Sequence, residues 1–295
     1  KPAIDILSKL KKNSITVFEL SSFKLQDLKR SPQIAVVLDI FPDHMDAHKN
    51  FREYVNAKAS IAKYQKRDDK IFYAAGNIYA KAIAQKGRGK KVMVDPKLFK
   101  LFSPQDLKIL GAHNFKNAVM AATVALNLGI NKNTIIKTIR AYRGLHYRLE
   151  LVRTLKGIKI YNDSASTNPM TTVAAIKSFK ENNVLIMGGK DKGLDYEPVA
   201  KALKNSSTKF VILFGENKNK IAKAMIRIKN KELRIMEVKN LESAVKTALR
   251  FAKLFIIHNS SFAILFSPGA ASFDMFVDYK DRGKKFNEIV KRLKG

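Results

Sequence analysis

Short runs rich in β-branched residues alternate with amphipathic helical patterns along nearly the whole sequence of 295 residues. This alternation is typical of parallel strands joined by crossover helices, because two parallel strands cannot be connected by a tight turn. A chain of this length also exceeds what one hydrophobic core usually serves, so we expect an α/β fold with two doubly wound domains. The strands are predicted at 15–20, 34–40, 70–74, 91–94, 184–187, 210–214 and 263–266, and the clearest helices at 51–64, 113–128, 196–204 and 241–255.

The boundary between the two domains is expected near residues 142–147. Residues 1–145 would then form the first domain and residues 146–295 the second. Directly after the boundary, two β-rich runs at 149–154 and 158–162 flank a Lys-Gly dipeptide. This pattern predicts a β-hairpin at the start of the second domain.

The chain carries a large positive charge, with 56 Lys plus Arg against 25 Asp plus Glu and a net charge of +31. Most of the excess is lysine spread along the chain, so a solvated lysine surface is favoured over nucleic-acid binding. The absence of cysteine excludes disulfides, thiolate zinc sites and cysteine nucleophiles. No apolar run approaches the roughly 18 residues of a membrane helix and no signal-peptide pattern opens the sequence, so we expect a cytoplasmic protein without a membrane partner.

A dense polar cluster follows the predicted strand at 34–40. Oxygen and imidazole ligands just past a buried strand are typical of metal and ligand sites in open α/β sheets. The alternative is that the aspartates cap the next helix and the histidines face solvent. On that helix, Lys58 lies on a face with apolar residues, which would favour its neutral, nucleophilic amine. The cluster consists of Asp39, Asp43, His44, Asp46 and His48.

Three further polar features of the first 150 residues admit two interpretations each. Glu19, at the end of the predicted strand 15–20, could bind magnesium or cap the next helix. Asn114, in the first turn of the predicted helix 113–128, could contact a nucleotide or cap that helix. Arg148 could bind a phosphate or pair with an acidic side chain.

Three loops of the second domain have compositions suited to anionic ligands. The loop 162–169 offers hydroxyl groups and a carboxylate before a proline that starts a helix, although ordinary capping would use the same residues. The glycine-rich loop 188–193 could approach a phosphate or a carboxylate, or could be only a tight turn. The segment 267–274 ends the last core strand and is expected to start the last helix, with Ser272 as a ligand or a cap.

The order of these motifs along one chain resembles the Mur ligase family, and the resemblance covers nearly all 295 residues. It implies an ATP-dependent amide ligase of peptidoglycan synthesis, with a central ATPase-type domain followed by a Rossmann-like domain. The last two motifs favour the branch that adds D-glutamate to UDP-N-acetylmuramoyl-L-alanine through an acyl phosphate. The motifs are VFELSSF, DHMDAH with AKASI, GAHNFKNAVMAA, GLHYRLE, YNDSASTNP, GGKDKG and SPGAASFDMFVDYKDRGKKF.

The resemblance also implies a role for individual residues. Glu19 and His44 match magnesium ligands, and Lys58 matches a carbamylated lysine that helps to hold a second magnesium ion, so these three would be catalytic. ATP and Mg²⁺ are therefore the expected cofactors, and the protein is expected to act as a monomer. The residues that match nucleotide-contacting positions are Asn114, Arg148 and Asp163, and those that match D-glutamate-receiving positions are Thr167, Lys192, Ser272 and Tyr279.

The sequence departs from the family pattern in two places. Ala165 stands where many members have a lysine. The phosphate loop of form G-x-x-G-K-[ST] does not occur, and the segment 87–90 is too short and lies in the wrong place to replace it. The resemblance puts that loop and a UDP-binding domain upstream of Lys1, so the chain resembles the last two of three domains. The alternatives are another amide ligase of the superfamily, such as a folylpolyglutamate synthase, or a non-catalytic nucleotide-binding protein.

Overall fold

The computed structural model describes residues 3–42, 48–227, 233–256 and 261–294. By its internal contacts the chain divides into two compact units. The first unit comprises Lys1–Phe99 and Val119–Leu128, and the second comprises Lys100–Ala118 and Gly129–Gly295. Parallel sheets covered by helices confirm the predicted α/β fold class.

The first unit is built on a parallel three-stranded sheet in the order β1-β2-β3. Consecutive strands are joined by helices, as the alternation in the sequence predicts. The helix after β1 begins at Phe51, and the side chain of its N-cap residue Asn50 accepts a hydrogen bond from the amide of Glu53, which satisfies one amide of the first turn. The elements are η1 (Ala3–Lys9), α1 (Ser22–Gln26), β1 (Ile34–Val37), α2 (Phe51–Lys63), β2 (Lys70–Ala74), α3 (Ile78–Ala84) and β3 (Lys90–Val94).

The apolar core of the first unit lies between β1, β2, α2 and α3. Ala62 on α2, Ile71 on β2 and Ala80 on α3 have no exposed surface. Small alanine side chains let the helices approach the sheet closely, so this core is compact although the sheet is small.

The strand predicted at 15–20 is wrong, since the segment has no regular secondary structure and pairs with no strand of the described sheet. Its apolar side chains are correspondingly exposed, with Val17 at 90% and Ile15 at 65%. A β-branched run becomes a strand only when another strand satisfies its backbone groups. The composition of this segment therefore indicates a high β-propensity, which is not sufficient to form a strand.

The second unit contains a six-stranded sheet in the order β4-β5-β9-β6-β7-β8. The β4–β5 pair is the antiparallel hairpin predicted from the sequence, and the other neighbouring pairs are parallel. The hairpin turn uses Lys156 and Gly157 with φ of 47° and 83°, as a two-residue turn with two left-handed positions requires. The strands are β4 (Glu150–Leu155), β5 (Ile158–Asn162), β6 (Asn183–Met187), β7 (Thr208–Leu213), β8 (Arg234–Glu237) and β9 (Phe262–Phe266).

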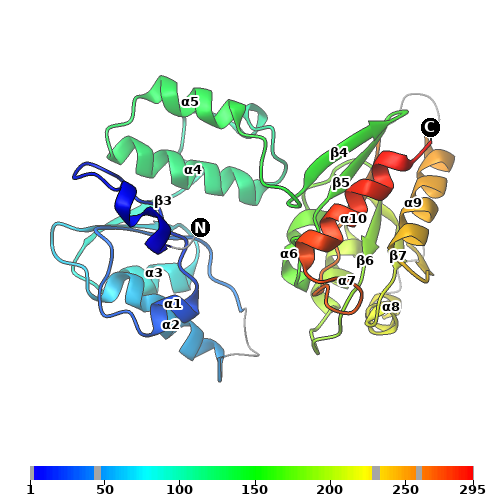
Figure 1. The fold of residues 1–295 in the computed structure, drawn as a ribbon, viewed down its shortest axis with the longest axis horizontal. Helices are drawn as coiled ribbons and strands as arrows, with labels where there is room; N and C mark the ends of the chain where they lie inside the picture. Colours follow the sequence, from blue (N-terminus) through cyan, green and yellow to red (C-terminus); the bar gives the residue numbers. More distant parts are fainter. Residues whose placement is uncertain (1–2, 43–47, 228–232, 257–260, 295) are drawn as a thin grey trace. The chain divides into compact units, whose positions relative to one another are not determined.

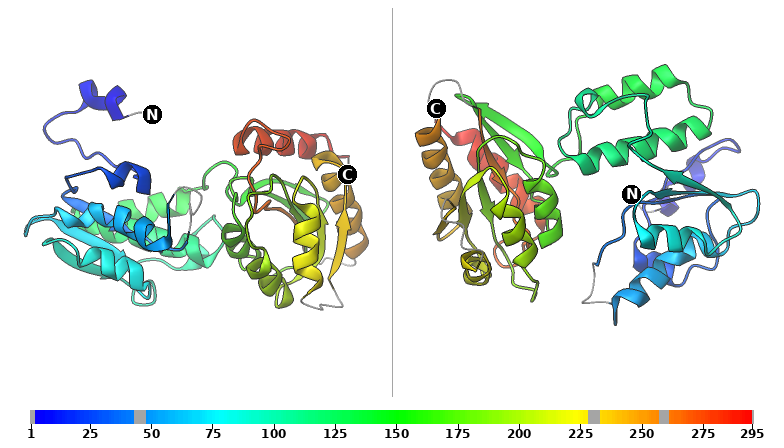
Figure 2. Two further views of the ribbon diagram at one scale, coloured as in Figure 1. Left: turned by 90° about the horizontal axis from the view of Figure 1, so that it is seen from below. Right: turned by 180° about the vertical axis from the view of Figure 1, so that it is seen from behind.

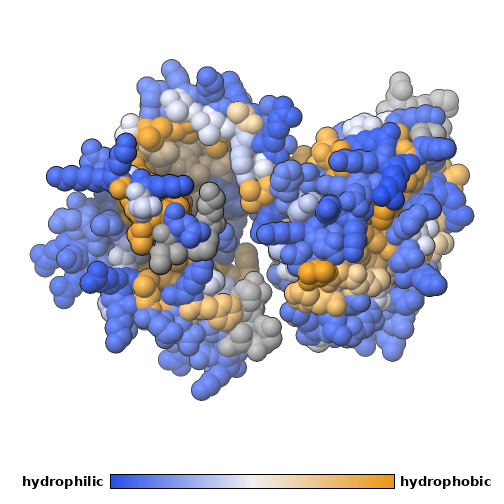
Figure 3. Space-filling view, in the orientation of Figure 1, coloured by the Kyte–Doolittle hydropathy of each residue, from blue (hydrophilic) through white to orange (hydrophobic). Residues whose placement is uncertain are grey.

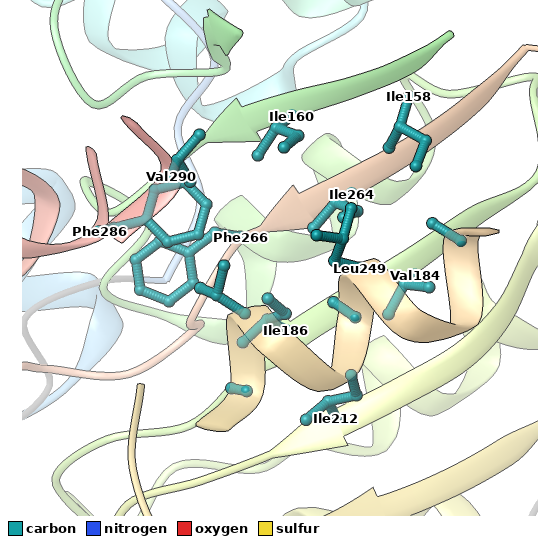
Figure 4. Close-up of a cluster of buried hydrophobic side chains, with 14 of the residues drawn as sticks. Ile158, Ile160, Val184, Ile186, Ile212, Leu249, Ile264, Phe266, Phe286 and Val290 are labelled. Carbon is teal, nitrogen blue, oxygen red and sulfur yellow. The ribbon is translucent and has the colours of Figure 1, made fainter. Parts of the chain in front are cut away.

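Helices cover both faces of this sheet (Figures 1 and 2). α9 (Leu241–Phe255) and α10 (Tyr279–Arg292) pack on one face around a cluster that includes Ile264 and Phe266. Figure 4 shows side chains of this cluster, with the rings of Phe266 and Phe286 stacked 4.5 Å apart between centroids. α6 (Pro169–Ile176), α7 (Glu197–Lys204) and α8 (Lys218–Ile226) pack on the other face around Leu185 and Leu265.

After the neighbouring strands β9 and β6, the chain turns toward opposite faces of the sheet. The chain after β6 continues to α7, whereas the chain after β9 continues to α10 on the other face. In open α/β sheets ligands bind at such a switch point, beyond the carboxyl ends of the strands. The loops at this edge of the sheet are those at 162–169, 188–193 and 267–274, the three that the sequence analysis singled out.

The remaining helices are α4 (Ala112–Asn127), which has residues in both units, α5 (Lys132–Ala141) and the short η2 (Pro104–Asp106). The last helix begins at Tyr279, because Asp278 caps it by accepting hydrogen bonds from the amides of Lys280 and Asp281. The expectation that the segment around Ser272 starts this helix is therefore wrong. Throughout the described ranges, no helix is long and apolar enough to cross a membrane.

Candidate active site

Asp163 is the buried carboxylate of the candidate site, at the carboxyl end of β5. Ser267, at the end of β9, donates a hydrogen bond of 2.7 Å to Oδ2, and the amide of Leu149 donates one of 3.2 Å to Oδ1. Burial raises the pKa of Asp163 to about 7, although these two donors and the charges of Arg148 and Arg282 act in the opposite direction. The site therefore holds a carboxyl group that titrates near neutral pH.

Arg282 on α10 is fully buried beside Asp163. Its Nε donates to the hydroxyl of Ser164 at 3.0 Å and its Nη2 to the carbonyl of the same residue at 2.9 Å. Its Nη1 donates to the carbonyl of Ala270 at 2.9 Å. Burial lowers the pKa of Arg282 to about 10, opposed by the charges of Asp274 and Asp163. One guanidinium therefore fixes the loop after β5 and the loop after β9 to the same helix.

Asn217 fixes the glycine loop after β6. Its Oδ1 accepts a hydrogen bond of 2.9 Å from the amide of Gly189, and its Nδ2 donates one of 2.6 Å to the hydroxyl of Tyr196. A side chain at Gly188 would collide with the carbonyl of Phe214, which explains why glycine is needed there. The sequence analysis assigned no role to Asn217, which the structure shows to be buried with two hydrogen-bond partners.

Four residues matched to D-glutamate positions surround this edge of the sheet. They lie after β5, after β6, after β9 and at the first position of α10. Among the described residues, none of their side chains has a hydrogen-bond or ion-pair partner, and the ammonium of Lys192 lies 5.7 Å from the centre of the Phe273 ring. The polar groups of Thr167, Lys192 and Tyr279 are open to a ligand, whereas Ser272 is only 2% exposed. The residues are Thr167, Lys192, Ser272 and Tyr279.

The residues matched to nucleotide positions differ in their surroundings. Arg148 is exposed, and its guanidinium makes no hydrogen bond or ion pair with another residue in the described ranges. Asn114 lies in the first turn of α4, where its Nδ2 donates to the carbonyl of Leu110 at 2.7 Å. Next to it, burial and the charge of Arg148 lower the pKa of His113. Arg148 thus offers a free cation, whereas Asn114 and Asp163 are engaged within the protein.

The predicted magnesium ligands belong to the first unit. Glu19 is exposed in the irregular segment before α1, and His44 lies outside the described residues. Lys58 is half-buried on α2, with its Nζ 5.0 Å from the centre of the Tyr54 ring. This contact is a cation–π interaction, and the neutral amine expected from the sequence stays a prediction. Among the described residues, no three His, Asp or Glu side chains form a group that could hold a metal ion.

His48 is buried rather than solvated, which corrects the expectation for the second histidine of the polar cluster. Its Nε2 lies 2.9 Å from the hydroxyl of Ser22, and its ring stacks on Phe23 and contacts the edge of Tyr54. Asp43 and Asp46, like His44, lie outside the described residues. His48 therefore stabilises the packing of α1 against α2.

Two domain families match the chain. Residues 4–95 match the family described as Mur ligase middle domain, and residues 147–254 match the family described as Mur ligase, glutamate ligase domain. The chain belongs to the Mur ligase family. The two matches follow each other in the order that the sequence motifs predicted.

Curated members of the Mur ligase family are similar over nearly the whole chain. The UDP-N-acetylmuramoylalanine–D-glutamate ligase of Acetivibrio thermocellus is 32% identical over 318 residues, which cover 99% of this chain and 66% of the relative. The enzyme of the same name from Aquifex aeolicus is 36% identical over 291 residues, covering 94% of this chain and 66% of the relative. The chain thus spans slightly less than two thirds of the length of these Mur ligases.

Solved structures of Mur ligases share the fold. MurF from Acinetobacter baumannii superposes with a TM-score of 0.67 at 16% identity, covering 90% of this chain and 62% of that protein. MurF from Thermotoga maritima, solved in complex with ADP, gives a TM-score of 0.61 at 14% identity, covering 89% of this chain and 64% of that protein. At these identities the likeness concerns the fold alone.

Proposed function

We propose that the protein takes part in the ATP-dependent addition of D-glutamate to UDP-N-acetylmuramoyl-L-alanine in peptidoglycan synthesis. The observation that carries this proposal is a set of polar side chains at the switch point of the second sheet that have no hydrogen-bond or ion-pair partner among the described residues, namely those of Thr167, Lys192, Ser272 and Tyr279. Two curated relatives named for this reaction align with nearly the whole chain and support it. The use of a nucleotide is supported by the ADP found in a MurF of the same fold.

The proposed reaction has two steps. A carboxylate oxygen of the first substrate attacks the γ-phosphorus of ATP, which gives an acyl phosphate and releases ADP. The amine of D-glutamate then attacks the acyl carbon, an amide bond forms, phosphate leaves and the nitrogen loses a proton. The first step brings anions together, so positive charge must offset the developing repulsion. Arg148 is free to supply such charge to the nucleotide.

D-Glutamate carries two carboxylates and one ammonium group. The ammonium of Lys192 can bind one carboxylate, and the hydroxyls of Thr167 and Ser272 can donate hydrogen bonds to the same or the other carboxylate. Asp163 and Arg282 hold the loops that carry these groups. Their part in the reaction is to fix the positions of the binding groups, so that the amine is presented to the acyl carbon in one orientation.

The magnesium site is proposed at Glu19, His44 and Lys58. It rests on the match of the motifs, because the described residues of the first unit form no metal-binding group. We also propose that the protein acts in the cytoplasm as a monomer, where its nucleotide substrates are available. Its exposed lysines are proposed to solvate the protein rather than to bind nucleic acid, and Figure 3 shows a predominantly hydrophilic surface on the face displayed.

The test is ligand binding and turnover by the purified chain. D-Glutamate added to ¹⁵N-labelled protein is expected to shift the amide resonances of Thr167, Lys192 and Ser272, and L-glutamate is expected to shift them less. Lys192→Ala should abolish these shifts, whereas Lys204→Ala, an exposed lysine at the end of α7, should retain them. Phosphate release stimulated by L-lysine, diaminopimelate or L-glutamate but not by D-glutamate would refute the proposed substrate.

A further inference from the structure

Two residues with left-handed backbone conformation flank Arg148. Tyr147 has φ of 65° and Leu149 has φ of 44°, and both carry a Cβ that this conformation places close to the backbone. The third non-glycine residue with positive φ in the described ranges, Lys156, belongs to the hairpin turn that requires it. Tyr147 is the third residue of a β-turn that is closed by a hydrogen bond of 3.2 Å from the amide of Arg148 to the carbonyl of Leu145, and among the described residues no such turn includes Leu149. A positive φ at the third position of a turn is usually taken by glycine or asparagine, so contacts around Tyr147 and Leu149 must offset the strain of their side chains.

The loop after β5 supplies some of these contacts. The carbonyl of Tyr147 accepts a hydrogen bond of 2.9 Å from the amide of Ala165, and the amide of Leu149 donates to Asp163. The amide of Tyr147 donates to the carboxylate of Glu150 at 2.9 Å. The backbone on both sides of Arg148 is thus tied to the loop that carries Asp163 and Thr167.

Gly283 supplies a contact of another kind. It lies in the interior of α10, where glycine costs about 1 kcal/mol relative to alanine. A Cβ at this position would lie 2.7 Å from Cγ and 2.9 Å from Cε1 of the Tyr147 ring. The carbonyl of Gly283 also accepts a hydrogen bond of 2.9 Å from Asn162, the residue before Asp163. The Tyr147 ring therefore occupies space that any other residue at position 283 would fill.

We propose that Gly283 and Tyr147 are positioning residues that together hold Arg148 beside Asp163. The ring of Tyr147, seated against the bare backbone of Gly283, anchors one left-handed residue, and Asp163 anchors the other. Arg148 then projects from a segment that is fixed at both ends. That Arg148 meets a nucleotide rests on the proposed function, whereas its fixed position does not.

A double-mutant cycle tests the positioning role without reference to activity. Gly283→Ala alone is expected to lower the melting temperature of the second unit by several degrees, although alanine favours the helix. In a Tyr147→Gly background, where the ring is gone and glycine suits the positive φ, the same substitution is expected to raise the melting temperature. Lys284→Ala, at the adjacent exposed position of α10, serves as the control. It should change the melting temperature by the same amount in the wild-type and Tyr147→Gly backgrounds. Stabilisation by Gly283→Ala in both backgrounds would overturn the proposal.

A second measurement follows Asp163 itself by the ¹³C resonance of its carboxyl group. In the wild type the Leu149 amide and the charge of Arg148 both favour the ionised form. Displacement of the 147–149 segment by Gly283→Ala should therefore raise the midpoint of this titration, and Lys284→Ala should not. An unchanged midpoint would also refute the positioning role. ATP affinity, measured in parallel, tests the proposed function separately. If the wild-type protein does not bind ATP, the proposed function is refuted. The double-mutant cycle and the Asp163 titration would still decide the role of Gly283.

Discussion

The hydroxyl of Ser267 donates a hydrogen bond of 2.7 Å to the carboxylate of Asp163, which joins the carboxyl ends of β9 and β5 inside the second unit. These two strands are neighbours in the sheet but lie about a hundred residues apart in the sequence. The pair is buried, so its energy depends on whether Asp163 is charged. The stability of the second unit should therefore vary with pH through this one group.

Asp163→Asn is expected to change the pH dependence of unfolding. The pKa of Asp163 is raised from 3.8 to about 7, so between about pH 4 and pH 7 the native state binds more protons than the unfolded state. The wild type should lose stability as pH rises through this window, by a few kcal/mol at most since one pKa unit corresponds to about 1.4 kcal/mol. Urea unfolding at pH 5 and pH 8 should show that the stability of the Asn variant relative to the wild type increases with pH.

The matched control for this prediction is Asp191→Asn. The amide of Gly193 and the side chain of Lys220 lower the pKa of Asp191, so its contribution is complete above about pH 4 and is lost only below it. Its replacement should give the same difference from the wild type at pH 5 and pH 8. A constant difference for Asp163→Asn over the same range would contradict the pH dependence argued from its burial.

Arg282→Met is expected to destabilise the second unit by about 2–4 kcal/mol. The substitution keeps most of the apolar volume of the side chain but removes the guanidinium donors to Ser164 and Ala270. The buried carbonyl groups of these two residues then lose their hydrogen bonds from the guanidinium. Arg292→Met, at an exposed position near the end of the same helix, should change stability by less than about 0.5 kcal/mol. Chemical denaturation measures both. Equal effects of the two substitutions would show that the buried guanidinium has no special part in holding the loops.

Much of the fold follows from local sequence patterns. The predicted helix at 241–255 coincides with α9, and the helices predicted at 51–64 and 113–128 end within one residue of α2 and α4. Their apolar residues recur at helical spacing, so the signal lies within the element itself. The strand predicted at 15–20 failed for the opposite reason, because pairing depends on a partner that the segment's own composition does not specify.

The candidate site was only partly predictable from the sequence. Loops rich in glycine and hydroxyl groups after predicted strands identified Asp163 and the region of Lys192, since the edge of a parallel sheet collects such loops. Arg282 and Asn217 were not identified. An arginine in a lysine-rich helix has the local pattern of a surface residue, and only the packing of α10 over two loops reveals that it has no exposed area. A helix-interior glycine next to it, Gly283, was the one available signal.

Asn217→Ala is expected to destabilise the protein by about 1–3 kcal/mol. The amide of Gly189 and the hydroxyl of Tyr196 would lose their buried partner. Asn219, two residues later and exposed in the first turn of α8, makes no side-chain hydrogen bond among the described residues, so Asn219→Ala should be nearly neutral. Thermal unfolding compares the two, and the NMR resonance of the Gly189 amide should move only in the first variant. An unmoved Gly189 resonance would mean that Asn217 does not hold the glycine loop.

Lys58 is predicted to form a carbamate when the protein is exposed to carbon dioxide. In this reaction the neutral amine attacks carbon dioxide, a nitrogen–carbon bond forms and one proton is released, so the modification should increase with pH and with bicarbonate. With ¹³C-labelled bicarbonate, a new carboxyl resonance is expected in the wild type and not in Lys58→Arg. Lys63 is the matched control on the same helix, because its Nζ also lies over a tyrosine ring, 5.3 Å from the centre of Tyr64, but the residue is exposed. A resonance that persists in Lys58→Arg and disappears in Lys63→Arg would show that Lys63, and not Lys58, is carbamylated. Lys58 would then contribute no carboxylate to the proposed magnesium site.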